Sequence, residues 1–236
     1  MWMNRVSRTN VHPDLVSVID LALRSLSKEG TPFKVYSGLR TFKEQDALYA
    51  KGRTKPGGIV TKAKGGQSMH NYGLAVDLAP LNLETPEDWD VYWPDPDKSD
   101  SIWFRLEEAF SSAALENSNE KIEFEWGGRW KFRDVPHCQV RTTVRELSSG
   151  YFPPSSNVEW MVFSHTTFLF NTPWMKKRSQ YLLKKLGLYD GKIDGVHGAE
   201  TRKAFTAYLF EKEVIPVKAL SEGVVELLVR DTFELL

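Results

Sequence analysis

Residues 74–79 form a short apolar stretch, as expected of a buried strand, yet this stretch contains one acidic residue, Asp77. A lone carboxylate inside an apolar strand costs several kcal/mol unless it is paired or coordinated. Any fold of this chain must therefore bring a cation or hydrogen-bond donors to Asp77. No single helix or turn of the sequence constrains the tertiary structure as much.

Two histidines are candidate partners for Asp77. His70 precedes Asp77 by seven residues, and His137 follows Asp134, which supplies a second carboxylate. Two imidazoles and one carboxylate with an open fourth position form a catalytic rather than a structural zinc site. Residue types and spacing alone leave two interpretations open: a metal site, or an ordinary set of buried polar groups that satisfy one another.

Hydrophobic periodicity predicts the elements around these residues. A helix is expected over residues 13–27 and a strand over residues 33–39. Thr41 and Glu44 form a capping box that opens a second helix. The glycine- and lysine-rich residues 55–66 are expected to form a mobile loop. Further along, the pattern predicts a helix at 102–115 and neighbouring strands at 124–130 and 135–140.

The mixture of strands and helices predicts an α+β fold with a small antiparallel sheet and flanking helices for the first part of the chain. Glycine, proline and serine gather at residues 150–156, which is typical of a domain junction. We therefore predict a first domain at 1–145, a linker at 146–172 and a small all-α domain of three helices at 173–236.

Composition excludes several classes of protein. Basic and acidic residues both number 31, so the formal net charge is zero and neither nucleic acid nor an anionic membrane is expected as a partner. Cys138 is the only cysteine, which excludes an intrachain disulfide.

The N-terminal residues are typical of an amphipathic helix rather than a signal peptide, and no apolar stretch is long enough to cross a membrane. We expect a chain made in the cytoplasm, with no membrane insertion.

Several motifs occur in a fixed order. The chain resembles the zinc D-alanyl-D-alanine peptidase superfamily, and more narrowly the L-alanyl-D-glutamate endopeptidases of phage endolysins and bacterial autolysins. The resemblance covers about residues 8 to 141. It is carried by Ser37-Gly38-Leu39-Arg40-Thr41, Gln45, Leu48-Tyr49, Gly52-Arg53, Ser68-x-His70-x-x-Gly73-x-Ala75-x-Asp77, Trp126-Gly127-Gly128-x-Trp130 and Asp134-x-x-His137.

The resemblance implies a role for each matching residue. It implies zinc as the cofactor and Asp134 as the general acid and base, and a carboxylate of this kind suits proton transfer. It implies that Arg40 stabilises the oxyanion. Ser68 and Tyr72 are expected at the substrate, as is Gln139, which shares a strand face with His137; for Tyr72, packing is an equally open interpretation. The implied zinc ligands are His70, Asp77 and His137.

Two departures from the family pattern affect the fine geometry. Cys138 stands where an aromatic residue is expected, and the link from Trp130 to Asp134 is a residue shorter than usual. An aspartate at position 134, where the carboxypeptidase branch tends to have glutamate, favours the endopeptidase branch.

Residues 179–209 resemble the three-helix peptidoglycan-binding domain found beside many wall hydrolases. The run Asp190-Gly191-Lys192-Ile193-Asp194-Gly195 carries the resemblance, while His197 replaces an expected aromatic residue. A generic helical bundle with a glycine-shaped loop is the alternative. A second wall contact on one chain would raise the effective concentration of the enzyme near its substrate.

Together these features predict a zinc-dependent endopeptidase that hydrolyses the L-alanyl-D-glutamate bond of bacterial peptidoglycan. It is expected to stay in the host cytoplasm until its release to the cell wall, as an endolysin does, with a separate holin-like protein for export. Two alternatives remain: a D,D-carboxypeptidase or D,D-endopeptidase with the same metal chemistry, and a non-catalytic wall-binding protein with a structural zinc ion.

Overall fold

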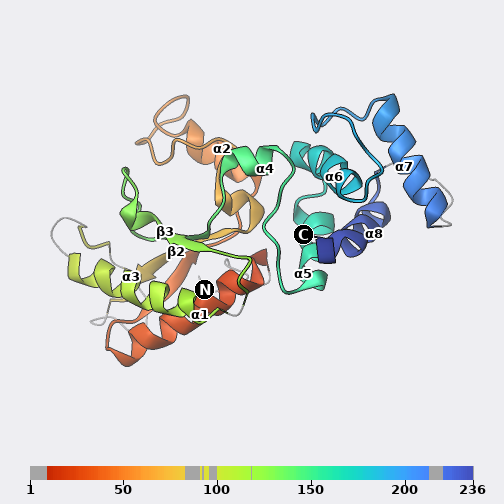
Figure 1. The fold of residues 1–236 in the computed structure, drawn as a ribbon. Helices are drawn as coiled ribbons and strands as arrows, with labels where there is room; N and C mark the ends of the chain where they lie inside the picture. The colour runs from red at the N-terminus through yellow and green to blue at the C-terminus, as the bar shows by residue number, and fades with distance from the viewer. Residues whose placement is uncertain are drawn as a thin grey trace. The chain divides into compact units, whose positions relative to one another are not determined.

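The computed structural model describes residues 10–82, 91, 93–95, 100–117, 119–212 and 220–235. The chain divides into two compact units, Met1–Arg141 and Thr142–Leu236 (Figure 1). Within the described residues, no helix combines the length and the apolar character needed to span a membrane.

The first unit has the α+β composition predicted from the sequence. Helix α1 begins with a proline, buries the apolar stripe that predicted it, and ends before Gly30, whose φ of 70° few other residues adopt. The predicted capping box of Thr41 and Glu44 opens α2. The elements are α1 (Pro13–Lys28), β1 (Phe33–Ser37), α2 (Phe42–Ala50), the 3-10 turn η2 (Met69–Tyr72), β2 (Ala75–Pro80), α3 (Asp100–Leu115), β3 (Phe124–Trp126), the 3-10 turn η4 (Gly127–Arg129) and β4 (His137–Val140).

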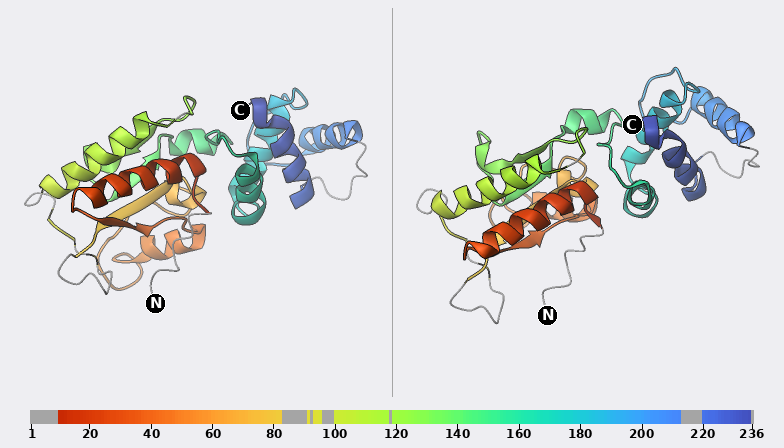
Figure 2. Two further views of the ribbon diagram at one scale, coloured as in Figure 1. Left: turned by 90° about the horizontal axis from the view of Figure 1, so that it is seen from below. Right: turned by 60° about the horizontal axis from the view of Figure 1, so that its bottom comes forward.

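Four antiparallel strands in the order β1-β2-β4-β3 form the sheet. Helices α1 and α3 lie side by side over one face, while α2 lies on the opposite side (Figures 1 and 2). Aromatic pairs join α3 to the sheet: Phe33 packs edge-on against Trp103, with ring centroids 5.9 Å apart. Because side chains alternate along a strand, each strand sends every second residue toward these helices and the others toward the opposite face.

A bulge in β1 changes which face its last residue uses. Val35 pairs with Leu78, but Ser37, two residues later, pairs with the neighbouring Asp77. The extra residue, Tyr36, shifts the alternation of side chains by one residue. Ser37 therefore lies on the same face of the sheet as Asp77. The bulge thus adds a hydroxyl to the face of the sheet that α1 and α3 leave uncovered.

The two strands predicted at 124–130 and 135–140 are shorter than expected. Gly127 begins a 3-10 turn, and a Cβ atom there would lie 2.5 Å from the carbonyl oxygen of Asp134. The backbone of the turn can approach residue 134 this closely only because position 127 has no side chain. Close packing across the connection therefore replaces strand pairing between residues 127 and 136.

The second unit is helical. Its elements are α4 (Val144–Ser148), α5 (Val158–Phe163), the π-helical turn η5 (Ser164–Phe168), α6 (Pro173–Lys185), α7 (Ala199–Glu211), α8 (Glu222–Thr232) and the 3-10 turn η6 (Phe233–Leu235). Side-chain caps from Thr143, Asn157 and Ser221 open α4, α5 and α8. Helices α6, α7 and α8 fall within the range predicted for three helices.

The predicted linker at 146–172 belongs to the core of this unit in the structure. Leu147, Phe152 and Met161 are fully buried, and the indole of Trp174 donates a hydrogen bond to the carbonyl of Leu147 at 2.7 Å. The division of the chain falls after Arg141. The prediction of a linker was wrong because glycine, proline and serine indicate turns, and a packed segment also contains turns.

Candidate active site

Pairing of β2 with β4 brings two of the three predicted ligands together. Asp77 and His137 are register partners, and η2 supplies His70 from the segment just before β2. Oδ1 of Asp77 lies 3.2 Å from Nε2 of His70 and 3.1 Å from Nδ1 of His137. Ligand atoms of the three side chains all lie within 4.8 Å of one another, which a single ion can bridge.

His70 is held so that one ring nitrogen faces this cluster. Its Nδ1 lies 2.7 Å from the carbonyl oxygen of Gly38, and a carbonyl can only accept, so Nδ1 carries the hydrogen. Nε2 therefore presents its lone pair to Asp77. The ring is 3% exposed, and Gly73, with a φ of 68°, ends the turn that carries it.

In His137 the two ring nitrogens have the opposite roles, and a side chain rather than the backbone holds the ring. The amide nitrogen of Gln139 donates to Glu125 at 2.5 Å, so its oxygen is the atom that lies 2.8 Å from Nε2 of His137. Nε2 therefore donates its hydrogen to Gln139, and Nδ1 presents a lone pair to Asp77. Metal-binding histidines typically have their second nitrogen fixed in this way.

The arrangement fits a cation. Two imidazole lone pairs and a carboxylate converge on one point, and three acceptors repel one another unless a positive charge lies between them. Without a metal ion, protonated imidazoles can supply that positive charge: burial alone would raise the pKa of Asp77, but the charge of His70 and hydrogen bonds from both rings, when they are protonated, hold it well below its usual range. Burial opposes protonation of His137, yet its contacts with Asp77 raise its pKa. Nitrogen and oxygen donors in this number suit zinc.

Arg40 approaches the same carboxylate from the segment after β1. Its Nη2 lies 3.8 Å from Oδ2 of Asp77 and donates to the hydroxyl of Ser37 at 3.1 Å. Its Nη1 donates to Oε1 of Gln45 at 2.7 Å. The bulge at Tyr36 is what places Ser37 within reach, so the irregularity in β1 helps to fix the guanidinium beside the ligands.

Asp134 lies in the connection between β3 and β4. Its backbone N–H donates to Gly127 at 3.0 Å, and its carbonyl accepts from the N–H of His137 at 3.1 Å. The residue keeps contact with solvent, while its carboxylate is partly enclosed beside the cluster. Loss of solvation beside the cluster raises its pKa, with His137 opposing the shift and Asp77 adding to it. A carboxylate with a raised pKa near the ligands is suited to take up and release a proton.

The three side chains predicted to contact substrate occupy different surroundings. Ser68 is half-buried at the start of η2. The hydroxyl of Tyr72 donates to the carbonyl of Gly66 at 3.0 Å, and burial raises its pKa to about 12. Both polar ends of Gln139 are engaged by His137 and Glu125. Tyr72 and Gln139 thus have partners within the chain, and substrate contact stays a prediction for all three.

Sequence reasoning assigned no role to three side chains that organise the site. Gln45 is fully buried and holds Arg40, as described above. Asn71 donates to the carbonyl of Arg40 at 2.9 Å and so joins the arginine segment to η2. Glu125 fixes Gln139. Gln45 and Asn71 stood within the recognised motifs; Glu125 had no signal of its own, because its relevance depends on pairing between β3 and β4.

The sequence is similar to those of known proteins. A sequence model of a family described as D-alanyl-D-alanine carboxypeptidase matches residues 61–140, which include the three candidate ligands and Asp134. The peptidoglycan L-alanyl-D-glutamate endopeptidase CwlK of Bacillus subtilis (strain 168) is 37% identical over 133 residues, which span 56% of this chain and 74% of that protein. The match to the crystal structure of the Serratia marcescens L-Ala D-Glu endopeptidase ChiX has 32% sequence identity and a TM-score of 0.43. It covers 57% of this chain and 83% of the ChiX chain. From the identity with CwlK across most of that protein's length, the chain belongs to the D-alanyl-D-alanine carboxypeptidase family of peptidases.

Proposed function

We propose that the protein is a zinc-dependent endopeptidase that hydrolyses the L-alanyl-D-glutamate bond in the stem peptide of bacterial peptidoglycan. The observation that carries the proposal is the convergence of His70, Asp77 and His137 with both imidazole lone pairs directed inward. The name of CwlK supports the choice of bond.

Each proposed role follows from a position in the site. When bound, a zinc ion would supply Lewis acidity toward a peptide carbonyl and toward water. Asp134 would accept a proton from the attacking water and hand it to the leaving amine, which its raised pKa favours. Arg40, fixed by Ser37 and Gln45, would donate hydrogen bonds to the oxygen that becomes negative during attack. Trp130, whose ring lies 5.1 Å from that of His137, would exclude water from one side.

Digestion of purified peptidoglycan tests this reaction. The zinc-loaded chain should release peptides with new D-glutamate amino termini, and a chelator should abolish the release. Asp134→Asn should keep zinc but lose at least about 100-fold in rate, as expected when a general base is removed. Wild-type activity in a zinc-bound Asp134→Asn chain would contradict the mechanism and leave the metal without a partner in proton transfer.

A D,D-carboxypeptidase or D,D-endopeptidase is the second candidate, because the matching family is described by D-alanyl-D-alanine cleavage. The two activities leave different termini on the same muropeptides. Mass spectrometry of the digest therefore separates them: free D-alanine, or cross-links cut after D-alanine, would favour the second candidate, and free D-glutamate amino groups the first.

For the second unit we propose attachment to peptidoglycan by residues 173–236. The loop between α6 and α7 is ordered around Gln180, which is fully buried. Its amide nitrogen donates to Asp194 and Thr201 at 3.1 Å, and its oxygen accepts from the N–H of Gly195 at 2.8 Å. This network holds the loop in one shape while leaving Val196 65% exposed.

Cosedimentation of the full Asp134→Asn chain with insoluble peptidoglycan tests the attachment. Val196→Asp should weaken it, whereas Phe210→Asp, at another exposed apolar side chain on α7, should not. If the Asp134→Asn chain and its Val196→Asp and Phe210→Asp variants bind equally well, the loop between α6 and α7 does not contact peptidoglycan. The endolysin role and the holin-like partner stay predictions, which expression with and without a holin would test.

A further inference from the structure

Two basic segments flank the candidate metal ligands along the chain. Residues 51–67, which connect α2 to η2, contain no aspartate or glutamate, although the whole chain has a formal net charge of zero. The connection between β3 and β4 has the same character just before Asp134. The cations are Lys51, Arg53, Lys55, Lys62 and Lys64 in the first segment and Arg129, Lys131 and Arg133 in the second.

Residues 61–63 of the first segment are tied to the active site by hydrogen bonds, although residues 55–66 were expected to form a mobile loop. The amide nitrogen of Gln45 donates to the carbonyl of Ala63 at 2.8 Å and to the hydroxyl of Thr61 at 3.3 Å. The oxygen of the same side chain accepts from Arg40. One buried glutamine therefore fixes both the guanidinium at Asp77 and residues 61–63.

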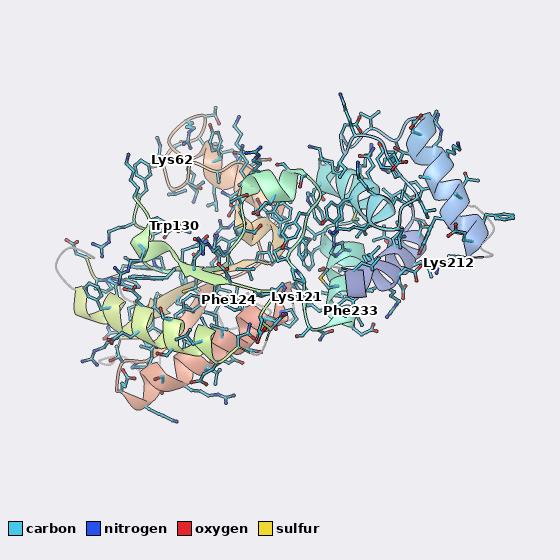
Figure 3. All side chains as sticks on the ribbon, viewed as in Figure 1. Lys62, Lys121, Phe124, Trp130, Lys212 and Phe233 are labelled. Carbon is cyan, nitrogen blue, oxygen red and sulfur yellow. The ribbon has the colours of Figure 1, made fainter. Side chains whose placement is uncertain are left out.

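Lys62 lies between the two residues that Gln45 holds. Its ammonium nitrogen lies 3.9 Å from the ring centroid of Phe132, in the connection that carries Trp130 and Asp134 (Figure 3 labels Lys62 and Trp130). Lys62 therefore joins the two segments that flank the ligands. An aromatic face positions an ammonium group without occupying its three N–H donors.

These donors are free for a ligand. Lys62 is exposed, and it forms no ion pair with any residue in the described ranges of the chain. Asp77, Asp134 and Glu125 lie at the site and would repel an anionic substrate. A substrate that carries a carboxylate near the scissile bond would need a cation at this place.

The bond of the proposed function supplies such a carboxylate. A D-glutamate acylated by L-alanine has two carboxyl groups, and continuation of the stem peptide uses only one of them. The other is negatively charged at neutral pH unless it is amidated. We propose that Lys62 is a specificity-determining residue that binds this free carboxylate, so that the enzyme prefers unamidated stem peptides. The inference rests on the proposed function.

Two soluble stem peptides of identical sequence test the proposal, one with the free D-glutamate carboxylate and one with its amide. The zinc-loaded full chain should cleave the acid with the higher kcat/KM. Lys62→Met should lower kcat/KM for the acid about 5-fold, the effect of one charge-assisted hydrogen bond at a partly exposed site, and change the amide less than 2-fold. Lys62→Arg should restore the preference. Lys121→Met, at an exposed lysine on another part of the same unit, is the matched control.

The outcomes separate this proposal from the proposed function. If the wild type cleaves neither peptide at the L-alanyl-D-glutamate bond, the proposed function fails and Lys62 loses its ligand with it. If the wild type cleaves both but Lys62→Met lowers both equally, or neither, only the role of Lys62 is overturned. If Lys62→Met cleaves both peptides as the wild type does but lyses walls rich in anionic polymers more slowly, Lys62 binds those polymers. That result also overturns its proposed role as a determinant of peptide specificity.

Discussion

His137 donates its Nε2 hydrogen to the amide oxygen of Gln139, two residues along the same strand, at 2.8 Å. Residues two apart on a strand face the same side, so β4 carries both the candidate ligand and the group that orients it. Gln139 is itself held by Glu125 on the neighbouring strand. The strands therefore act as the frame that directs Nδ1 of His137 toward Asp77.

Replacing Gln139 with leucine should weaken zinc binding about 10- to 100-fold, the usual cost of losing a partner that orients a metal-binding histidine. Competition with a chromophoric chelator measures the affinity. Gln67→Leu, at an exposed glutamine of the same unit, serves as the control and should bind zinc as the wild type does. Equal affinities for the Gln139→Leu and wild-type chains would show that the ring is oriented by packing alone.

Gly127→Ala should disrupt catalysis through the backbone. The added Cβ would lie 2.5 Å from the carbonyl oxygen of Asp134 and 3.1 Å from Cβ of His137, so the connection must shift. We expect kcat to fall about 100-fold, since displacements near 1 Å have that effect, together with a lower free energy of unfolding. Gly58→Ala meets no atom within 4 Å and should leave both quantities unchanged. An active, stable Gly127→Ala chain would argue that the turn is free to move.

Arg40→Lys should separate oxyanion stabilisation from metal binding. Lysine keeps the charge but cannot reach Ser37 and Gln45 with a rigid fork, so the positive group loses its fixed direction. We expect kcat to fall about 100-fold with little change in KM or in zinc content. Steady-state kinetics and metal analysis check this, with Arg141→Lys, at an exposed ion pair, as the comparison. A change confined to KM would assign Arg40 to substrate binding.

The second unit should lose stability on acidification because of His165. This ring is fully buried and accepts a hydrogen bond from Nε of Arg178 at 3.1 Å. Burial, and then the charge of Arg178, hold its pKa well below the usual value. Below about pH 6.5 the unfolded chain binds a proton that the folded unit does not, so the free energy of unfolding falls by up to about 1.4 kcal/mol per pH unit.

Urea unfolding between pH 5 and 7, with metal removed so that zinc release does not contribute, measures this slope. His165→Gln should flatten the pH dependence of the second unit whatever its effect on stability at pH 7. His197→Gln is the comparison, since that ring is only partly buried and should change the slope less. A slope that is unchanged in His165→Gln would mean that the protonated ring is accommodated.

Local structure could largely be predicted from the sequence. The apolar stripe of α1 and the capping box of α2 predicted both helices, because their interactions span four residues or fewer. The linker at 146–172 was the main error, since turn-forming residues do not reveal whether Phe152 and Met161 find a core. The length of the strands at 124–130 and 135–140 was also misjudged, because the approach of Gly127 to Asp134 is not a local property.

The sequence by itself determined which side chains are available to the site, and in which order: two imidazoles, a carboxylate that an apolar strand cannot leave unpaired, and a second aspartate just before the last ligand. Only the tertiary structure decided what those groups face. His137 meets Asp77 across 60 residues of chain, and its tautomer follows from Gln139 and Glu125 on paired strands. Hydrogen-bond direction depends on register between strands, and register is set by the packing of the whole sheet.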